Sequence, residues 1–513
     1  MMALDLHTSE QARKRLKRRY AAETRFRLIG LTALLIAFGF LAFFLVTIVK
    51  QAYPAFLQNY LRLTIDLQQQ EIDPNKSGDP QIIGAANFDG ILKNGVSALL
   101  SDQAPREEKR ALGKLISSGA AVLLRKDVIE HPEWIGGTIN YKVPLDDTAD
   151  LYFKGQLGKL QNIKPHLDAT VNVAGDILTI NADFSSQANA LQALDTAQPS
   201  YFLKDGGTLI KLTQISPTQA TGRTLFSMPL NSEKTGQWQL LKFDRPENER
   251  KLDDRSILLL ENFKELGLVT TSISKEFFML GASREAEMAG IFSAMIGSLL
   301  TLFVTLLVSF PLSVAAAIYL EEFAPKTRFT EIIEVNINNL AAVPSIIFGL
   351  LGLAVFLNVF GMPRSAPLVG GLVLALMTLP VIIIASRAAL RAVPPSVKEA
   401  ALGIGASHMQ AVFHHVLPLA VPGILTGSIL GTARALGETA PLLLIGMVAF
   451  VVDTPKGFFD AATLLPVQIF MWNDFPEIAF QQKTAAAILM LLLFLAAMNL
   501  AAVLLRNKFE RRW

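Results

Sequence analysis

The 513-residue sequence contains no cysteine, which excludes disulfide bonds, thiolate catalysis and cysteine-based metal sites. It also lacks the G-x-x-x-x-G-K-[S/T] motif that holds nucleotide phosphates in many ATPases, so we do not expect this chain to hydrolyse ATP. Residues 50–285 contain no long apolar run, although the whole chain is 51% hydrophobic and has a mean hydropathy of +0.38. The apolar residues are therefore concentrated elsewhere, and this composition indicates a membrane protein.

Six apolar segments are long enough to cross a bilayer, because a helix of about 20 residues spans the hydrocarbon core. The first, residues 28–49, is too long for the apolar part of a cleaved signal peptide and is interpreted as a signal anchor. The other five are residues 288–320, 335–363, 365–386, 417–452 and 484–505. The expected fold class is an all-α polytopic membrane protein with six transmembrane helices and a soluble α+β insert between the first two.

The distribution of charge predicts how these helices are oriented. Residues 1–27 carry eight Lys and Arg and three acidic residues, which is typical of a cytoplasmic flank and explains this cluster better than nucleic-acid binding does. If the N-terminus is cytoplasmic, the segments on the cytoplasmic side carry 17 Lys and Arg in total. The two short loops on the outer side carry three. The predicted domains are a cytoplasmic N-terminus (1–27), a first transmembrane helix (28–50), an external insert (51–285), a five-helix transmembrane domain (286–505) and a cytoplasmic C-terminus (506–513).

The insert combines helical and strand patterns and carries 26 Lys and Arg against 29 Asp and Glu. Helices are predicted at residues 51–70, 88–100 and 106–129, and strands at 137–143, 170–180 and 208–215. Asp205, Gly206 and Gly207 could belong to a phosphate-binding loop, but a hairpin turn explains them better. We assign the insert no chemistry and expect it to cover the outer mouth of the transmembrane domain.

Residues 394–427 form a polar to amphipathic loop on the predicted cytoplasmic side. Ser396 and Glu399 have the spacing of a capping box, which predicts a short helix that begins at Ser396. Gly405 permits a sharp bend, and Leu417–Pro418 is predicted to start the next span. An ordinary capped helix at the membrane surface would also account for these features.

No metal or catalytic cluster is evident in the sequence. The histidines of the loop, His408, His414 and His415, have no carboxylate at ligand spacing and are expected to be solvated. No nucleophile or carboxylate pair occurs at a usable spacing, so an enzyme is not expected.

The loop resembles the EAA loop of ABC-importer membrane subunits. The matching residues are Glu399, Ala400, Ala401, Gly405 and Leu417–Pro418. The resemblance implies the type I permease fold of these importers and a coupling helix that docks into a groove of a separate ATPase subunit. It also implies that ATP and Mg²⁺ bind to that partner and that this chain carries no cofactor.

A second distinctive segment, residues 431–441, places Arg434 and Glu438 inside the fifth predicted span. A charge at the bilayer centre costs about 2.5–3.5 kcal/mol on insertion scales, so Arg434 is expected to face a pathway or a partner. Glu438 follows four residues later on the same predicted helix face and can neutralise it. The guanidinium group suits phosphate because it donates two parallel hydrogen bonds, but a structural ion pair between helices is the alternative.

Three segments resemble the membrane permease of the high-affinity phosphate importer. They are residues 434–442 (RALGETAPL), residues 342–350 (AVPSIIFGL) and residues 390–394 (LRAVP), and the Thr-Ala-Pro after Glu438 favours the PstA-type subunit. The resemblance implies a bacterial inner-membrane protein that translocates phosphate past Arg434, Glu438 and Thr439. It also implies as partners two ATP-binding subunits, a homologous PstC-type permease and a periplasmic phosphate-binding protein.

Other polar residues and prolines in the spans are compatible with a translocation pathway whose helices change position. Ser345 and Asn338 are predicted to lie near the translocation route, together with Asn336 and Asn339. The prolines expected to interrupt helices are Pro311, Pro344, Pro380, Pro422 and Pro441.

Two alternative functions remain open from the residues alone. The substrate could be another oxyanion, such as molybdate or sulfate. The chain could instead be a membrane-anchored periplasmic sensor or scaffold whose insert binds a ligand or partner.

Overall fold

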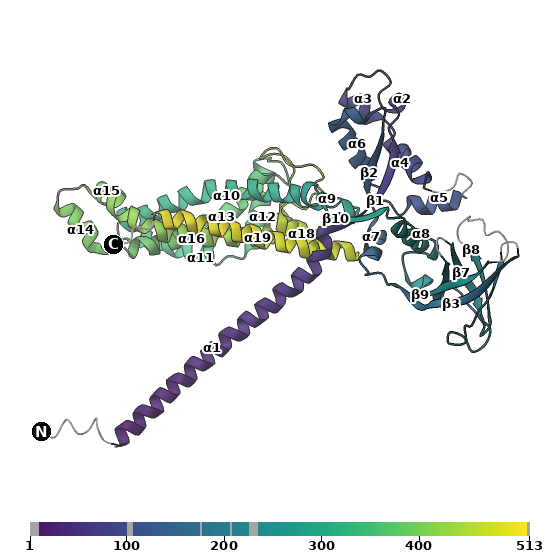
Figure 1. Cartoon of the computed structure of the whole chain (residues 1–513). Helices are drawn as coiled ribbons and strands as arrows, with labels where there is room; N and C mark the ends of the chain where they lie inside the picture. Colours follow the sequence, from purple (N-terminus) through teal and green to yellow (C-terminus); the bar gives the residue numbers. More distant parts are fainter. Residues whose placement is uncertain (1–9, 100–105, 175–176, 206–207, 225–233, 510–513) are drawn as a thin grey trace.

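A long helical bundle and a lobed α+β region lie at opposite ends of the molecule (Figure 1). The computed structural model describes residues 10–99, 106–174, 177–205, 208–224 and 234–509. Parts of the two predicted cytoplasmic termini, and Gly206 and Gly207 of the predicted hairpin turn, lie outside the described residues.

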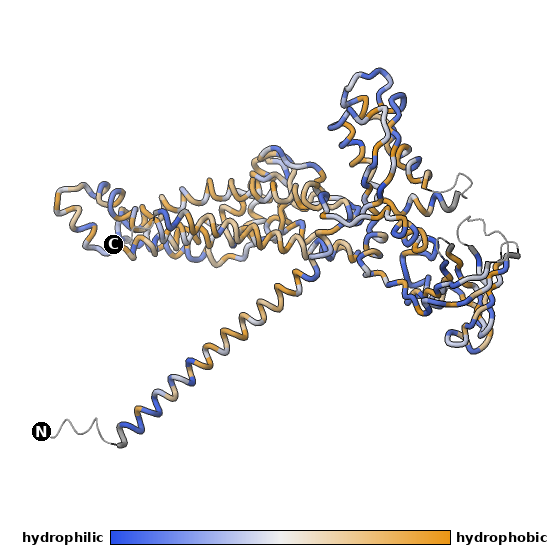
Figure 2. Tube along the Cα trace, in the orientation of Figure 1, coloured by the Kyte–Doolittle hydropathy of each residue, from blue (hydrophilic) through white to orange (hydrophobic). Residues whose placement is uncertain are grey.

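The bundle contains the apolar segments of the sequence, and most residues along its helices are hydrophobic (Figure 2). Its helices are α1 (Glu10–Ala52), α10 (Phe292–Ile318), α11 (Arg328–Ala341), α12 (Ser345–Gly352), α13 (Pro367–Arg391), α14 (Pro395–Gly403), α15 (His408–Ala411), α16 (Leu417–Gly437), α17 (Ala440–Leu444), α18 (Leu465–Asn473) and α19 (Ile478–Phe509).

Five helical segments of the described chain are long and apolar enough to cross a membrane. They are Arg13–Phe56, Phe292–Phe323, Pro367–Arg391, His408–Gly437 and Ile478–Lys508. The protein is therefore an integral, polytopic membrane protein.

The predicted span at residues 335–363 is interrupted at Pro344, as the sequence predicted. Arg328–Ala341 and Ser345–Val359 are two helices bent by 98°, and they provide a sixth span only if they are counted together. The break lies at Pro344, which has no N–H to donate and disfavours helical backbone at the residue before it.

Small residues allow the central helices to approach closely. A Cβ atom at Gly371 of α13 would lie 2.5 Å from the Val304 side chain of α10, and one at Gly423 of α16 would lie 2.6 Å from the Ala389 side chain of α13. The Thr305 hydroxyl donates to the Gly371 carbonyl at 3.2 Å. Close backbone packing and interhelical hydrogen bonds replace the hydrophobic driving force that is missing within lipid.

α1 leaves the bundle at an angle, so most of its length has no neighbour among the residues that the structure describes (Figure 1). Only its last turns pack against the bundle, where Ile48 and Ala52 are buried beside α19. The apolar surface of α1 is thus available to lipid or to another subunit.

The insert contains two antiparallel sheets. The smaller has the order β10 (Val269–Ile273), β1 (Leu57–Asp66), β2 (Thr138–Pro144). The larger has the order β5 (Gln192–Ala193), β7 (Thr208–Ile215), β6 (Pro199–Asp205), β9 (Lys234–Pro246), β3 (Leu160–Ala174), β4 (Ile177–Asn181), β8 (Gln219–Thr224). β7 also pairs with β8, which closes the larger sheet on itself around Trp238, Phe184 and Leu240.

Helices cover the smaller sheet and connect the insert to the bundle. They are α2 (Gln69–Ile72), α3 (Pro80–Ala85), α4 (Phe88–Ser97), α5 (Arg106–Gly113), α6 (Ala120–Glu130), α7 (Asp147–Phe153), α8 (Asp254–Glu265) and α9 (Lys275–Met279). Phe277 of α9, Trp472 of α18 and Phe480 of α19 belong to one buried apolar cluster, which joins the insert to the transmembrane helices.

The α+β class of the insert is confirmed, and so are the strands predicted at 137–143 and 208–215 (β2 and β7) and the helix near residue 88 (α4). The predicted hairpin is also confirmed by the pairing of Asp205 with Thr208. The predicted helix at 106–129 is two helices, α5 and α6, and the strand predicted at 170–180 is the β3–β4 hairpin.

The predicted helical extension over residues 51–70 is wrong. Helix α1 ends at Ala52, a short 3₁₀ turn with Pro54 follows, and β1 begins at Leu57. Leu61, Leu63 and Ile65 are buried on the core face while the residues between them are exposed. This alternation is the period of a strand, and the proline separates it from the helix.

Candidate functional site

The fifth apolar segment is a broken helix, and the break carries the Arg434 region. α16 ends at Gly437, the backbone of Glu438 is extended (φ −82°, ψ 122°), and the short helix α17 begins with Pro441 in its first turn. The span predicted at residues 417–452 therefore ends earlier than predicted, at Gly437, and the interruption predicted at Pro441 is confirmed. Pro441 cannot donate the hydrogen bond that a continuous helix would need there.

The helices that follow the two breaks contact each other. α12, which follows the break at Pro344, packs against α17, which follows the break at Glu438. A Cβ atom at Gly349 would lie 2.6 Å from Pro441 Cα, so the two backbones are in close contact. Interrupted helices that pack together place exposed backbone polar groups inside a membrane domain, where a pathway can use them.

Arg434 lies in the last turn of α16, not in the middle of a helix as the sequence suggested. Its Nε atom is 3.8 Å from Glu438 Oε1, an ion pair that is longer than a hydrogen bond. The Arg434 side chain is 49% exposed and that of Glu438 is 23% exposed. Within the described chain this is the only ion pair of Arg434, so much of its guanidinium group remains available to a ligand or partner.

The other predicted pathway residues are placed differently. Ser345 begins α12 and Thr439 directly precedes α17, so both lie at the starts of the two helices that pack together. Asn338 is exposed on α11, on the other side of the bend. None of the described residues of α11 is buried. The roles of Ser345, Thr439 and Asn338 in translocation stay predictions.

Gly349→Val is expected to destabilise the protein by about 1–3 kcal/mol, because the added side chain would collide with the Pro441 backbone and overpack the α12–α17 contact. The thermal unfolding midpoint of the purified protein measures this loss. Gly437→Ala is the control, since no atom lies within 4 Å of a Cβ atom there. An unchanged midpoint in Gly349→Val would contradict the close packing of the two helices.

The predicted coupling segment is a helix, a tight turn and a second helix, α14 and α15, at the end of the bundle opposite the insert (Figure 1). Glu399 and Ala400 are exposed on α14, Ala401 is buried, and Ile404 in the turn is 84% exposed. Gly405 has φ +94°, which confirms the predicted bend. An exposed acidic and apolar surface at a bundle end is suited to docking on another protein.

Two details of this segment correct the sequence prediction. α14 begins at Pro395 and has no side-chain cap at Ser396, whereas the capping box is formed by Ser407 and Gln410 at the start of α15. Leu417–Pro418 begins α16 as predicted, but the helical segment is already continuous from His408 to Gly437 and passes through a π-helical stretch, Val412–Val416.

An ion-pair cluster behind this segment was missed by the sequence analysis. Arg387 of α13, which is 8% exposed, lies 3.4 Å from Glu321 at the end of the α10 span and 2.6 Å from Glu334 of α11. Arg391 also binds Glu321, at 2.8 Å. The only indication of this cluster in the sequence was that Glu321 directly follows a run of 33 uncharged residues. The cluster connects the α10 span, α11 and α13 at one end of the bundle.

Glu322 connects the coupling segment to the same end of the bundle. Lys398 of α14 lies 2.6 Å from its carboxylate, and His408 Nε2 is 2.8 Å from its backbone carbonyl. The His408 ring also packs edge-on against Phe323. The prediction that His408 is solvated is therefore wrong, whereas His414 and His415 are exposed.

Comparisons with known proteins agree with this architecture. Residues 309–513 match the family described as "Binding-protein-dependent transport system inner membrane component", and residues 13–161 match a domain of unknown function, DUF3333. The chain is 33% identical over 215 residues to the probable ABC transporter permease protein YqgI of Bacillus subtilis (strain 168), an alignment that covers 40% of this chain and 72% of that protein.

The names of two further relatives include a substrate. The phosphate transport system permease protein PstA 1 of Mycobacterium tuberculosis (strain CDC 1551 / Oshkosh) is 32% identical over 232 residues, or 45% of this chain and 75% of that protein. The phosphate transport system permease protein PstC of Pasteurella multocida (strain Pm70) is 33% identical over 233 residues, or 41% of this chain and 71% of that protein. The chain belongs to the family of binding-protein-dependent transport system inner membrane components.

Proposed function

We propose that this chain is the membrane permease subunit of an ATP-driven importer of inorganic phosphate. The observation that carries the proposal is the half-exposed Arg434 at the break between α16 and α17, with Glu438 only 3.8 Å away. The names of the two phosphate permeases to which the chain is similar support the same substrate. The planar fork of arginine binds phosphate oxygens with two charge-assisted hydrogen bonds.

In this proposal Glu438 balances the charge of Arg434 when no phosphate is present. A phosphate ion replaces the carboxylate as the partner of the guanidinium group, and its own charge repels Glu438. The long distance of the pair is favourable for such an exchange, because little hydrogen-bond energy is lost when it opens. Thr439 and Ser345 would offer hydroxyl groups at the starts of α17 and α12.

The coupling route runs from α14 and α15 through Glu322 to the α10 span. A partner ATPase would bind the exposed surface around Glu399, Ala400 and Ile404, and movement there would pull on the Lys398 and His408 contacts. The Arg387 cluster would pass that movement to α11 and α13. The bundle would thereby alternate between outward-open and inward-open states.

The full importer would contain two ATP-binding subunits that hold ATP and Mg²⁺, a homologous PstC-type permease and a periplasmic phosphate-binding protein. We place the chain in the bacterial inner membrane as a six-span permease, with the bent α11–α12 pair as one span. Both termini would be cytoplasmic and residues 51–285 periplasmic. This orientation is supported by the arrangement in Figure 1, where the start of α1 and the end of α19 lie at the α14–α15 end of the molecule.

Uptake by the purified complex in proteoliposomes tests the substrate. Radiolabelled phosphate is expected to accumulate only with ATP and the binding protein, and unlabelled phosphate should compete far better than sulfate or molybdate. This preference is expected because two of the relatives to which the chain is similar are named as phosphate permeases. Accumulation of sulfate or molybdate in place of phosphate would show that the substrate is another oxyanion. Absence of any ATPase from the complex would favour the alternative of a membrane-anchored sensor.

A further inference from the structure

Three carboxylates meet where the insert joins the transmembrane bundle. Asp146 directly precedes α7, and Glu285 and Glu287 lie in the short segment before α10. One oxygen of each carboxylate lies within 4.8 Å of the others. Oxygen ligands of Ca²⁺ lie about 2.3–2.6 Å from the ion, so ligands on opposite sides are roughly 5 Å apart, and one ion is within reach of all three residues.

Glu287 is the residue that points to a ligand. It is only 3% exposed, and neither of its carboxylate oxygens has a hydrogen-bond partner in the described part of the chain. Burial raises the pKa of Glu287 to about 7, against a smaller lowering by the nearby Ser117 hydroxyl, and Asp146 and Glu285 raise the pKa further. A buried carboxylate without a partner is costly unless a cation or a proton compensates it.

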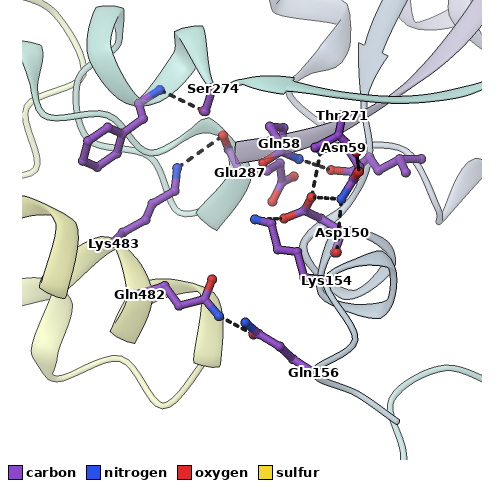
Figure 3. Close-up of polar contacts among 12 residues, drawn as sticks. Gln58, Asn59, Asp150, Lys154, Gln156, Thr271, Ser274, Glu287, Gln482 and Lys483 are labelled. Carbon is purple, nitrogen blue, oxygen red and sulfur yellow. Dashed lines mark hydrogen bonds and ion pairs between the residues drawn. The ribbon is translucent and has the colours of Figure 1, made fainter. Parts of the chain in front are cut away.

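Neither neighbouring lysine forms an ion pair with the Glu287 carboxylate in the described part of the chain. Lys154 forms its ion pair with Asp150. Lys483 donates to the backbone carbonyl of Ala289 at 2.6 Å. It also donates to the backbone carbonyl of Glu287 at 3.4 Å, the contact drawn in Figure 3. The charge of Lys154 is thus balanced by Asp150, whereas Lys483 leaves one positive charge beside the three carboxylates without hydrogen-bonding to the carboxylate of Glu287.

The cluster also borders a cavity. Asp146 and Glu285 line a space of about 650 Å³ in the insert, whose other lining residues include Ser117 and the cationic residues Lys93, Lys109, Arg110 and Lys114. We propose that Asp146, Glu285 and Glu287 bind a divalent cation, Ca²⁺ or Mg²⁺, which fastens the insert to the start of α10. An all-carboxylate oxygen set is typical of these hard cations and unsuited to softer metals.

Thermal unfolding of the purified full-length protein in lipid nanodiscs tests the site. After EDTA treatment, at a pH above the pKa of Glu287, addition of CaCl₂ or MgCl₂ is expected to raise the unfolding midpoint. The rise should be about 2.5 °C for unfolding of the whole 513-residue chain when the ion is present at 100 times its dissociation constant. Separate titrations with the two salts identify the preferred cation, and KCl at equal ionic strength controls for screening.

Glu287→Gln is expected to abolish this rise, and in EDTA it should be at least as stable as the wild type because the buried charge is gone. Glu276→Gln is the matched control, since Glu276 is also buried but accepts a hydrogen bond from Tyr60 at 2.5 Å and lies outside the cluster. That variant should retain the rise. No rise with either salt in the wild type, or an equal rise in Glu287→Gln, would overturn the proposal.

Terbium luminescence provides a second measurement that does not depend on the stability of a variant. Tb³⁺ should bind the wild type and be displaced by the preferred cation, and Asp146→Asn should weaken its binding at least tenfold. Equal Tb³⁺ binding by the wild type and Asp146→Asn would also overturn the site.

Discussion

Arg434→Gln is expected to reduce phosphate uptake at least 100-fold in importer complexes that still assemble. Glutamine keeps much of the length and polarity of the side chain but lacks the positive charge and the planar guanidinium group with its parallel N–H donors. Two charge-assisted hydrogen bonds to phosphate would be weakened, at about 1.5–3 kcal/mol each, which corresponds to roughly 100-fold or more. Uptake of radiolabelled phosphate into proteoliposomes measures the effect, and co-purification of the partner subunits checks assembly.

Two further variants separate a role in transport from a structural ion pair. If Arg434 only held the α16–α17 break together through Glu438, then Arg434→Gln and Glu438→Gln would impair uptake equally, because each removes the same pair. In our proposal Glu438→Gln is milder, and Arg434→Lys retains intermediate uptake because it keeps the charge without the bidentate fork. Normal uptake by Arg434→Gln would refute a direct contact with phosphate.

Gly405→Asp is expected to uncouple ATP hydrolysis from transport, with phosphate uptake reduced at least tenfold while the partner ATPase remains active. Gly405 has φ +94°, a conformation that costs a residue with a Cβ atom about 1–2 kcal/mol, so the turn between α14 and α15 should reorganise. No atom lies within 4 Å of a Cβ atom at this position, so the bundle itself should not be disturbed. Parallel measurements of ATP hydrolysis and uptake by the same proteoliposomes test the prediction.

Gly403→Ala is the control for the coupling turn. It adds a methyl group two residues earlier, also with no atom within 4 Å, and its backbone does not have a positive φ. Uptake and ATP hydrolysis should both stay close to the wild-type values. Coupled transport by Gly405→Asp would show that the α14–α15 turn does not transmit force from the ATPase.

The helix breaks illustrate the limits of prediction from sequence. Five prolines were expected to interrupt helices, yet Pro311, Pro380 and Pro422 lie inside continuous helices, and only Pro344 and Pro441 lie at breaks. The residue type is the same in all five cases. A proline leaves one carbonyl without its partner, and the surrounding helices decide whether the helix continues past it.

The sequence by itself determined the features that depend on local composition and spacing. Apolar length identified the spans, alternation identified β2 and β7, and the four-residue spacing of Arg434 and Glu438 predicted their ion pair. Only the tertiary structure decided the contacts between distant segments, such as Glu321 with Arg387 and Asp146 with Glu285 and Glu287. No periodicity along the chain encodes such contacts, because they arise only when separately folded elements pack against one another.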